Sequence, residues 1–262
     1  MHCLEQYRGK LLSSSNRELR VIIANPDETS IHRFRVGVKR LTALYRFFAA
    51  VDPEIDSRQI LRPARKLSNA ISRVRDVHIT LNLFSELEGL DANDVISLKR
   101  ALDTRCREEY RAFQSLVAGG APIPLRMPTV RSLGLSETTL LRHKAEVLQQ
   151  SRLQIFDDKR RLDTRRWHDK RILLKRYHHS LDAFSACPGH SQDEKELMQM
   201  KMLEQLLGDW HDRVIAVEIL QSLPRLQTRA EGAIAALRRQ ERALLASSRI
   251  YLARFALGRT SD

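Results

Sequence analysis

The stretch "IHRFRVGVKRLTALYRFF", residues 31–48, holds five Arg or Lys side chains and one His, but no Asp or Glu. Its apolar residues recur with the period of an α-helix, and one arc of that helix holds Leu41, Leu44 and Phe48. At about 100° per residue, a separate sector of roughly 60° holds His32, Arg35, Lys39 and Arg46. The stretch therefore predicts a helix with one face for a core and another face that is cationic.

Similar helical periods run along most of the chain, and no stretch shows the alternation of a strand. The low content of Gly and Pro, 10 and 8 of 262 residues, also favours helices. We expect an all-α fold, with helices near 3–24, 27–51, 57–74, 76–88, 92–118, 137–161, 164–186, 192–208, 210–222 and 225–257. Residues 119–136 are rich in proline, and we expect them to link two helical halves, 1–118 and 137–262.

The two halves resemble each other in sequence. A shift of 136 residues without a gap gives five identities over the seventeen positions 32–48. The aligned pairs are His32–His168, Arg35–Arg171, Lys39–Lys175, Arg40–Arg176 and Phe48–Phe184. The same register continues to Leu67–Leu203, Asp76–Asp212 and Ile79–Ile215. These matches predict an internal duplication, in which each half is a helical bundle of the same plan.

A second row of cations follows in the first half. Residues 57–75 contain six Arg or Lys and no acid. Steps of three or four residues align Arg58, Arg62, Lys66, Asn69 and Arg73. Pro63 is expected either to kink this helix or to mark its true start.

The second half repeats the first row, with His168, Arg171, Lys175 and His179, but not the other. Met198 and Met202 stand at the positions that match Arg62 and Lys66. We therefore expect the first half to carry more of the binding.

The charge pattern indicates an anionic partner. A solvated helix face normally mixes signs, because Glu–Lys pairs stabilise a helix and like charges destabilise it. Two neighbouring acid-free helices accept this repulsion, and the whole chain carries a net charge of +13. Nucleic acid, an acidic membrane surface and a phosphate-rich ligand are all compatible with this charge.

The paired basic motifs resemble those of the CHAD domain, the "conserved histidine α-helical domain". The family pattern is similar to H-x-x-R-x-x-x-[KR]-[KR], once per half, and here it reads His32-x-x-Arg35-x-x-x-Lys39-Arg40 and His168-x-x-Arg171-x-x-x-Lys175-Arg176. A second family element resembles LG-x-x-R-D. It appears as Arg75-Asp76 within "AISRVRDVHI", and as "LLGDWHDRVI", where His211-Asp212 replaces Arg-Asp.

The resemblance implies two four-helix bundles related by pseudo-twofold symmetry, with a basic surface or channel that binds inorganic polyphosphate without catalysis. No cofactor or metal is implied. The ligand residues would be His32, Arg35, Lys39, Arg40, Arg46, Arg58, Arg62, Lys66, Arg73, His168, Arg171, Lys175, Arg176 and His179. We expect structural roles for Asp76 and Asp212, either as N-caps or as orienters of a neighbouring Arg. Asp169, inside the second motif, and the two methionines depart from the family pattern and predict an asymmetric site.

Three other functions stay open on the sequence. A nucleic-acid-binding protein would share the electrostatics, but stacking platforms are few, with only Phe34, Tyr45 and Phe47 near the cations. A metal-dependent phosphohydrolase is suggested only by "WHD" at 167–169 and 210–212, where neighbouring cations disfavour a metal. A scaffold docking on an acidic protein or a polyphosphate granule is compatible with polyphosphate binding.

The cysteines and the hydropathy bear on location. Cys3, Cys106 and Cys187 are far apart and form no CxxC motif, which predicts reduced thiols. No apolar run reaches the 18 or so residues of a membrane span. We therefore expect a cytoplasmic protein.

Overall fold

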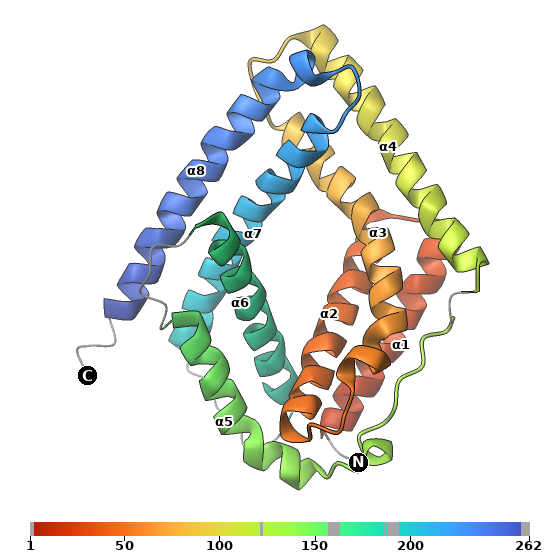
Figure 1. The fold of residues 1–262 in the computed structure, drawn as a ribbon, viewed down its shortest axis with the longest axis vertical. Coiled ribbons are helices and arrows are strands. Elements are labelled where there is room, and N and C mark those ends of the chain that lie inside the picture. Colours follow the sequence, from red (N-terminus) through yellow and green to blue (C-terminus); the bar gives the residue numbers. More distant parts are fainter. Residues whose placement is uncertain (1–2, 121–122, 157–162, 186, 188–193, 258–262) are drawn as a thin grey trace. The chain divides into compact units, whose positions relative to one another are not determined.

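The computed structural model describes residues 3–120, 123–156, 163–185, 187 and 194–257 (Figure 1). Over these residues the chain forms α-helices and one 3-10 turn, Arg131–Leu133, and no strand. The helices are α1 (Cys3–Ala24), α2 (Glu28–Val51), α3 (Ser57–Ser85), α4 (Ala92–Ala118), α5 (Glu137–Phe156), α6 (Thr164–Ser185), α7 (Glu194–Gln221) and α8 (Gln227–Leu257). The predicted all-α class is confirmed.

Two predicted helix breaks are wrong. Residues 57–85 form one helix, and so do residues 194–221. Between positions 72 and 78 the sequence contains no Gly or Pro, so the α3 backbone has no reason to break there. In α7, Gly208 lies inside the helix and is tolerated at a cost of about 1 kcal/mol relative to Ala. The predicted helix limits at 161, 186 and 192 lie outside the described residues.

The start of α3 follows from its cap. The Asp56 carboxylate accepts hydrogen bonds from the Arg58 and Gln59 backbone N–H groups, at 2.9 and 3.0 Å. This is the N-cap geometry that satisfies the first free donors of a helix. Pro63 therefore lies inside α3 and does not mark its start.

The chain divides into two compact units, each assembled from two separate stretches. Unit 1 comprises Met1–Asn69 and Leu116–Met200, and unit 2 comprises Ala70–Ser115 and Lys201–Asp262. Each unit takes helices from both sides of the proline-rich stretch 119–136. The sequence duplication into halves 1–118 and 137–262, with pseudo-twofold symmetry, stays a prediction.

Unit 1 is built around α2. This helix contacts α1, α5 and α6, and α6 also contacts α1 and α5. The apolar face of α2 supplies Ile31, Phe34, Leu41, Leu44 and Phe48, all buried. Phe47 meets Phe184 of α6 edge to face, with ring centroids 4.8 Å apart. The core therefore fixes α6 against α2, which places the two predicted basic motifs on helices in contact.

Residues 123–130, which we call the strap, follow α4 without regular secondary structure and are hydrogen-bonded to the helices of unit 1. The Asn16 side chain on α1 donates to the Leu125 carbonyl oxygen at 3.0 Å and accepts from the Leu125 N–H at 2.7 Å. Glu5 accepts from the Val130 N–H at 2.9 Å, and the Tyr45 hydroxyl donates to the Pro128 carbonyl oxygen. Because Leu125 and Val130 are also buried, residues 123–130 form part of the unit 1 structure.

Unit 2 has its own core between α4, α7, α8 and the second part of α3. Its buried residues include Val77, Phe84, Leu102, Leu220 and Leu237. At the edge of this core, Arg229 of α8 donates to the Ser97 hydroxyl of α4 at 2.6 Å. The unit is therefore held by apolar packing with polar contacts at its rim.

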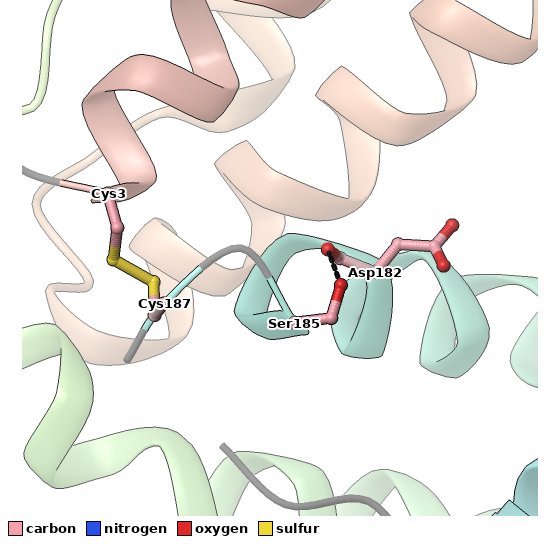
Figure 2. The surroundings of a disulfide bond; sticks show 4 residues. All are labelled: Cys3, Asp182, Ser185 and Cys187. Atoms are coloured by element: carbon pink, nitrogen blue, oxygen red, sulfur yellow. Dashed lines mark hydrogen bonds between the residues drawn. A yellow bond between two sulfur atoms is a disulfide. The ribbon is translucent and has the colours of Figure 1, made fainter. Parts of the chain in front are cut away.

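Cys3 and Cys187 form a disulfide, which corrects the prediction of reduced thiols for this pair (Figure 2). Their Cα atoms lie 5.2 Å apart, although 184 positions separate them in the sequence. Because α1 contacts α6, the start of one helix meets the end of the other, and no sequence spacing signals this. Cytoplasmic disulfides are uncommon, so the cytoplasmic location stays a prediction and loses one of its two arguments.

Cys106 in unit 2 is a free cysteine, and its Sγ atom lies 3.2 Å from His78 Nε2. Burial raises the pKa of the Cys106 thiol, and Asp103 raises it further. The thiol therefore stays protonated at neutral pH and lacks the thiolate character of a nucleophile. Within the described residues, no helix is long and apolar enough to cross a bilayer.

Candidate anion-binding site

The cations of α2 are presented by a well-defined helix. Asp27 caps its start by accepting from the Ser30 N–H at 2.8 Å. With the apolar face in the core, the remaining surface carries exposed His32 and Lys39 and half-buried Arg35, Arg40 and Arg46. The predicted separation of an apolar and a cationic face on this helix is therefore present in the structure.

A first group of cations joins α2 to α6. Burial lowers the pKa of His32, and the positive charges of Arg35, Lys39 and Lys175 lower it further. Lys175 belongs to the second basic motif, on α6, so the two motifs act on one imidazole. His32 is therefore largely neutral at pH 7 in the absence of an anion.

A second group joins α2, α3 and α6. Burial lowers the pKa of Arg46, and so do the charges of Arg176, Arg65 and Arg58. The pKa of Arg176 is lowered by burial and by Arg65, while Asp169 opposes this effect. Four guanidinium groups from three helices thus repel one another in unit 1.

These two groups together form what we call the cationic cluster: His32, Arg35, Lys39, Arg46, Arg58, Arg65, Lys175 and Arg176. Seven of its members are predicted ligand residues. Arg65 is the exception, because the predicted row of three- and four-residue steps passes over it, although on the helical wheel it lies only about 20° from Arg58. Its proximity to Arg46 and Arg176 depends on how α3 packs, which the wheel of one helix does not contain.

A groove of about 400 Å³ lies between α1 and α2. From α2 it is lined by His32, Arg33 and Arg40, and from α1 by Ser14 and Arg17. Arg17 also pairs with the carboxylate of the buried Glu18 at 3.1 Å. Arg17 was not predicted because it belongs to no row of cations and is followed directly by the acidic Glu18. Arg33 was not predicted because the 136-residue shift aligns it with Asp169, which is an acid.

One acid lies within this basic region. Asp182 of α6 contacts Arg40, with Oδ2 and Nη2 3.2 Å apart. It also lies 3.7 Å from His178 Nε2 and 3.8 Å from His179 Nδ1. Two predicted ligand residues, Arg40 and His179, therefore share a carboxylate that the sequence analysis did not single out.

Comparison with known proteins identifies the family. A family model for the CHAD domain matches residues 6–221. The chain belongs to the CHAD family. Its fold is similar to the crystal structure of the CHAD domain from the plant Ricinus communis, with a TM-score of 0.66 and 22% identity, covering 95% of this chain and 86% of that one. It is also similar to PptA from Streptomyces chartreusis, with a TM-score of 0.59 and 16% identity, covering 96% and 97%. No curated relative matches the sequence.

The remaining predicted ligands of this CHAD chain divide between the units. Unit 1 also holds exposed Arg62 and Lys66 on α3, and half-buried His168 and Arg171 on α6. Arg73 lies in unit 2, where Glu109 is 3.7 Å away and offsets its charge. The second-half counterparts of Arg62 and Lys66, Met198 and Met202, are 72% and 50% exposed, so surface cations in one half are replaced by surface thioethers in the other.

Asp76 and Asp212 lie inside α3 and α7, so the N-cap alternative for them is wrong. Both act on Arg75 in unit 2. Burial lowers the pKa of Arg75, and Asp212 and Asp76 oppose this effect. This arrangement supports a role for the two carboxylates as orienters of Arg75.

The two WHD tripeptides of the CHAD chain are anchored by their tryptophans. The side chains of Trp167, in unit 1, and Trp210, in unit 2, are both buried. Over the described residues, no three His, Cys, Asp or Glu side chains group in a way that could hold a metal ion.

Proposed function

We propose that the cationic cluster of unit 1 binds inorganic polyphosphate without catalysing a reaction on it. The CHAD resemblance implies this ligand, and the chemistry of the cluster supports it. Polyphosphate carries about one negative charge per phosphate unit, and Arg side chains bind non-bridging phosphate oxygens in bidentate fashion.

The observation that carries the proposal is the mutual repulsion within the cluster. Burial and neighbouring cations both lower the pKa values of His32, Arg46 and Arg176. Such crowding raises the free energy of the protein without ligand, and a polyanion lying along α2, α3 and α6 would remove it. The core packing that brings the three helices together thus also prepares the site.

The aromatic side chains distinguish polyphosphate from single-stranded nucleic acid. Phe34 and Tyr45 are fully buried, and Phe47 is 3% exposed. None of these three rings is available for a base to stack on, although single-strand binders rely on such platforms. We therefore favour a ligand without bases.

The groove between α1 and α2 extends the site toward α1. Arg17 and Arg33 line it together with His32 and Arg40. A polymer that contacts His32 would thus have two further guanidinium groups beside it. We therefore include Arg17 and Arg33 among the residues that bind polyphosphate.

A competition experiment tests the proposal. Binding of long-chain polyphosphate and of single-stranded DNA with equal charge is measured across a salt series. We expect polyphosphate to bind at least about tenfold more tightly and DNA not to displace it. Equal affinity for both polymers would favour a generic basic surface, and tighter DNA binding would overturn the proposal.

Charge-reversal variants then locate the site. Lys39, Arg58 and Arg176 are exposed members of the cluster from three helices, and all three are changed to Glu. The logarithmic salt slope should fall by about 2 or more, at roughly 0.7 per lost contact. The control changes the exposed Arg100, Arg107 and Arg111 of α4 to Glu, which gives the same charge change in unit 2. A similar loss in both variants would contradict a site in unit 1.

The absence of catalysis is tested separately. Long-chain polyphosphate is incubated with the protein with and without Mg²⁺, and the chain length of the polymer is followed. We expect no shortening. Shortening that the cluster variant abolishes would show a hydrolase instead.

A further inference from the structure

Asp182 stands where the sequence repeat would place a cation. The 136-residue register aligns it with Arg46, a central member of the cationic cluster. The second half thus carries a carboxylate at the position where the first half carries a guanidinium. This reversal of charge lies on the same helix as the second basic motif, five positions before the disulfide-bonded Cys187 (Figure 2).

The carboxylate of Asp182 is ionised and held among basic groups. Burial raises its pKa, but the contact with His179 and the charges of His178 and Arg40 outweigh this, so that the pKa of Asp182 lies below its ordinary value. Tyr7 of α1 is also close to this pair, and burial is the main reason why its pKa is raised to about 12. The phenol therefore stays neutral, and Asp182 supplies the negative charge of the group.

The contacts of Asp182 leave hydrogen-bonding capacity unused. At 3.7 and 3.8 Å the two His contacts are longer than hydrogen bonds. Among the described residues, no hydrogen bond reaches the buried atoms Asp182 Oδ2, Arg40 Nε or His179 Nδ1. A phosphoryl oxygen with better geometry would gain the bonds to Arg40 and His179 that the carboxylate does not make.

We propose that Asp182 is a built-in counter-anion that occupies Arg40 and His179 in the free protein and that a phosphate polymer displaces. Asp182 would thereby lower the affinity of the site and determine how many cations a ligand finds unpaired. The inference rests on the proposed polyphosphate binding and adds the regulation of that site. A polymer already bound at neighbouring cations presents its next phosphate at high local concentration, which lets it compete with the tethered carboxylate.

The first test is Asp182→Asn, which keeps the shape and removes the charge. We expect the affinity for long-chain polyphosphate to rise by about tenfold at low salt. The salt slope should become steeper by about 0.7, because Arg40 now carries a counterion that binding releases. Glu54→Gln is the matched control, since Glu54 is an exposed acid in the same unit and its neutralisation should leave the slope unchanged.

A double-mutant cycle with Arg40→Gln separates displacement of the pair from general electrostatics. Without Arg40 the main partner of the carboxylate is gone, so Asp182→Asn should raise affinity only about two- to threefold in that background. An equal gain in both backgrounds would overturn the proposal, and so would a loss of affinity in Asp182→Asn with its thermal unfolding unchanged. If the wild-type protein failed to bind polyphosphate at all, the proposed function would fail, whereas binding that Asp182→Asn does not strengthen would refute only the counter-anion.

Discussion

His32 shows how a single residue can report on the site. Its imidazole is exposed enough to meet a ligand, yet burial and three neighbouring cations hold its pKa below the usual value. The unfolded chain, with a His pKa of about 6.5, takes up this proton first as the pH falls. The free energy of unfolding therefore falls as the pH drops below about 6.5, because the proton binds more readily to the unfolded chain. A bound polyanion would offset this loss by stabilising the protonated imidazole of His32.

We predict that polyphosphate affinity rises by about threefold to tenfold between pH 7.5 and 5.5, since one proton changes affinity at most tenfold per pH unit. In His32→Gln this increase should be largely lost, as measured by titration calorimetry at several pH values. His78→Gln is the control, because burial and Arg75 also lower the pKa of His78, but in unit 2. A pH profile that His32→Gln leaves unchanged would remove His32 from the site.

The sequence predicted the chemistry of individual residues better than their partners. The two basic motifs, their helices and the apolar face beside them follow from spacing alone. Arg17 and Asp182 could not be found in this way, because Arg17 lines a groove together with α2 and Asp182 pairs with Arg40 of α2. Arg65 lies on the same face of its helix as Arg58 and could have been included. A helical wheel describes one element, whereas these contacts depend on how two or three elements pack.

Helices α1 and α2 pack closely where Gly37 faces Ser15. A Cβ atom added at Gly37 would overlap the Ser15 Oγ atom of α1, and Ser15 is buried. Here glycine is needed for room and not for backbone freedom, since Gly37 lies inside α2. Gly37 also lines the groove that contains Arg17 and Arg33, so the close packing of α1 against α2 helps to shape this groove.

We predict that Gly37→Ala destabilises the protein by about 1–3 kcal/mol through overpacking, despite the better helix propensity of Ala. Replacing Ser15 as well, in Ser15→Ala/Gly37→Ala, removes the hydroxyl oxygen and should restore most of the loss. Urea unfolding of the two single variants and the double variant measures the coupling. Additive effects would show that the two helices do not touch at this point.

Element boundaries were predicted well where capping residues mark them. The predicted starts at 27 and 57 lie within one residue of the starts of α2 and α3, where the Asp27 and Asp56 carboxylates cap the helices. The false breaks were placed at position 75, beside Asp76, and at position 209, shortly before Asp212. No Gly or Pro lies near position 75, and Gly208 is tolerated inside α7. The electrostatic role of these aspartates is exerted from within continuous helices.

At the scale of the molecule, the strap 123–130 connects distant parts of the chain within unit 1. Asn16 makes both of its hydrogen bonds to Leu125, which is 109 positions away. Asn16→Ala leaves a buried residue with an unpaired N–H and C=O group. The strap should then be the first part of unit 1 to loosen.

We predict that Asn16→Ala lowers the free energy of unfolding by about 2 kcal/mol, or roughly 1 kcal/mol for each lost hydrogen bond. Urea unfolding measures the global effect, and the amide exchange rate of Leu125 measures the local one. Arg20→Ala, an exposed position on the same helix, serves as the control. Unchanged exchange at Leu125 would mean that apolar packing alone holds the strap.

The fold class and the helical content could be predicted from the sequence, but the division into units could not. A chain read from one end to the other suggests that neighbouring segments form a domain. Instead, α3 and α7 each pass from unit 1 into unit 2, at positions 69–70 and 200–201. No composition change marks these points, because a continuous helix needs none.

The disulfide between Cys3 and Cys187 closes residues 3–187 into a covalent ring, which contains most of unit 1 and the Ala70–Ser115 stretch of unit 2. A protease that cuts once between these positions opens the ring but releases no fragment. The two pieces would stay joined by the disulfide, so that their buried side chains could remain packed against each other. In gel electrophoresis a nicked protein would run as one species without reductant and as two with it, so the bond would hide backbone damage until the protein is reduced.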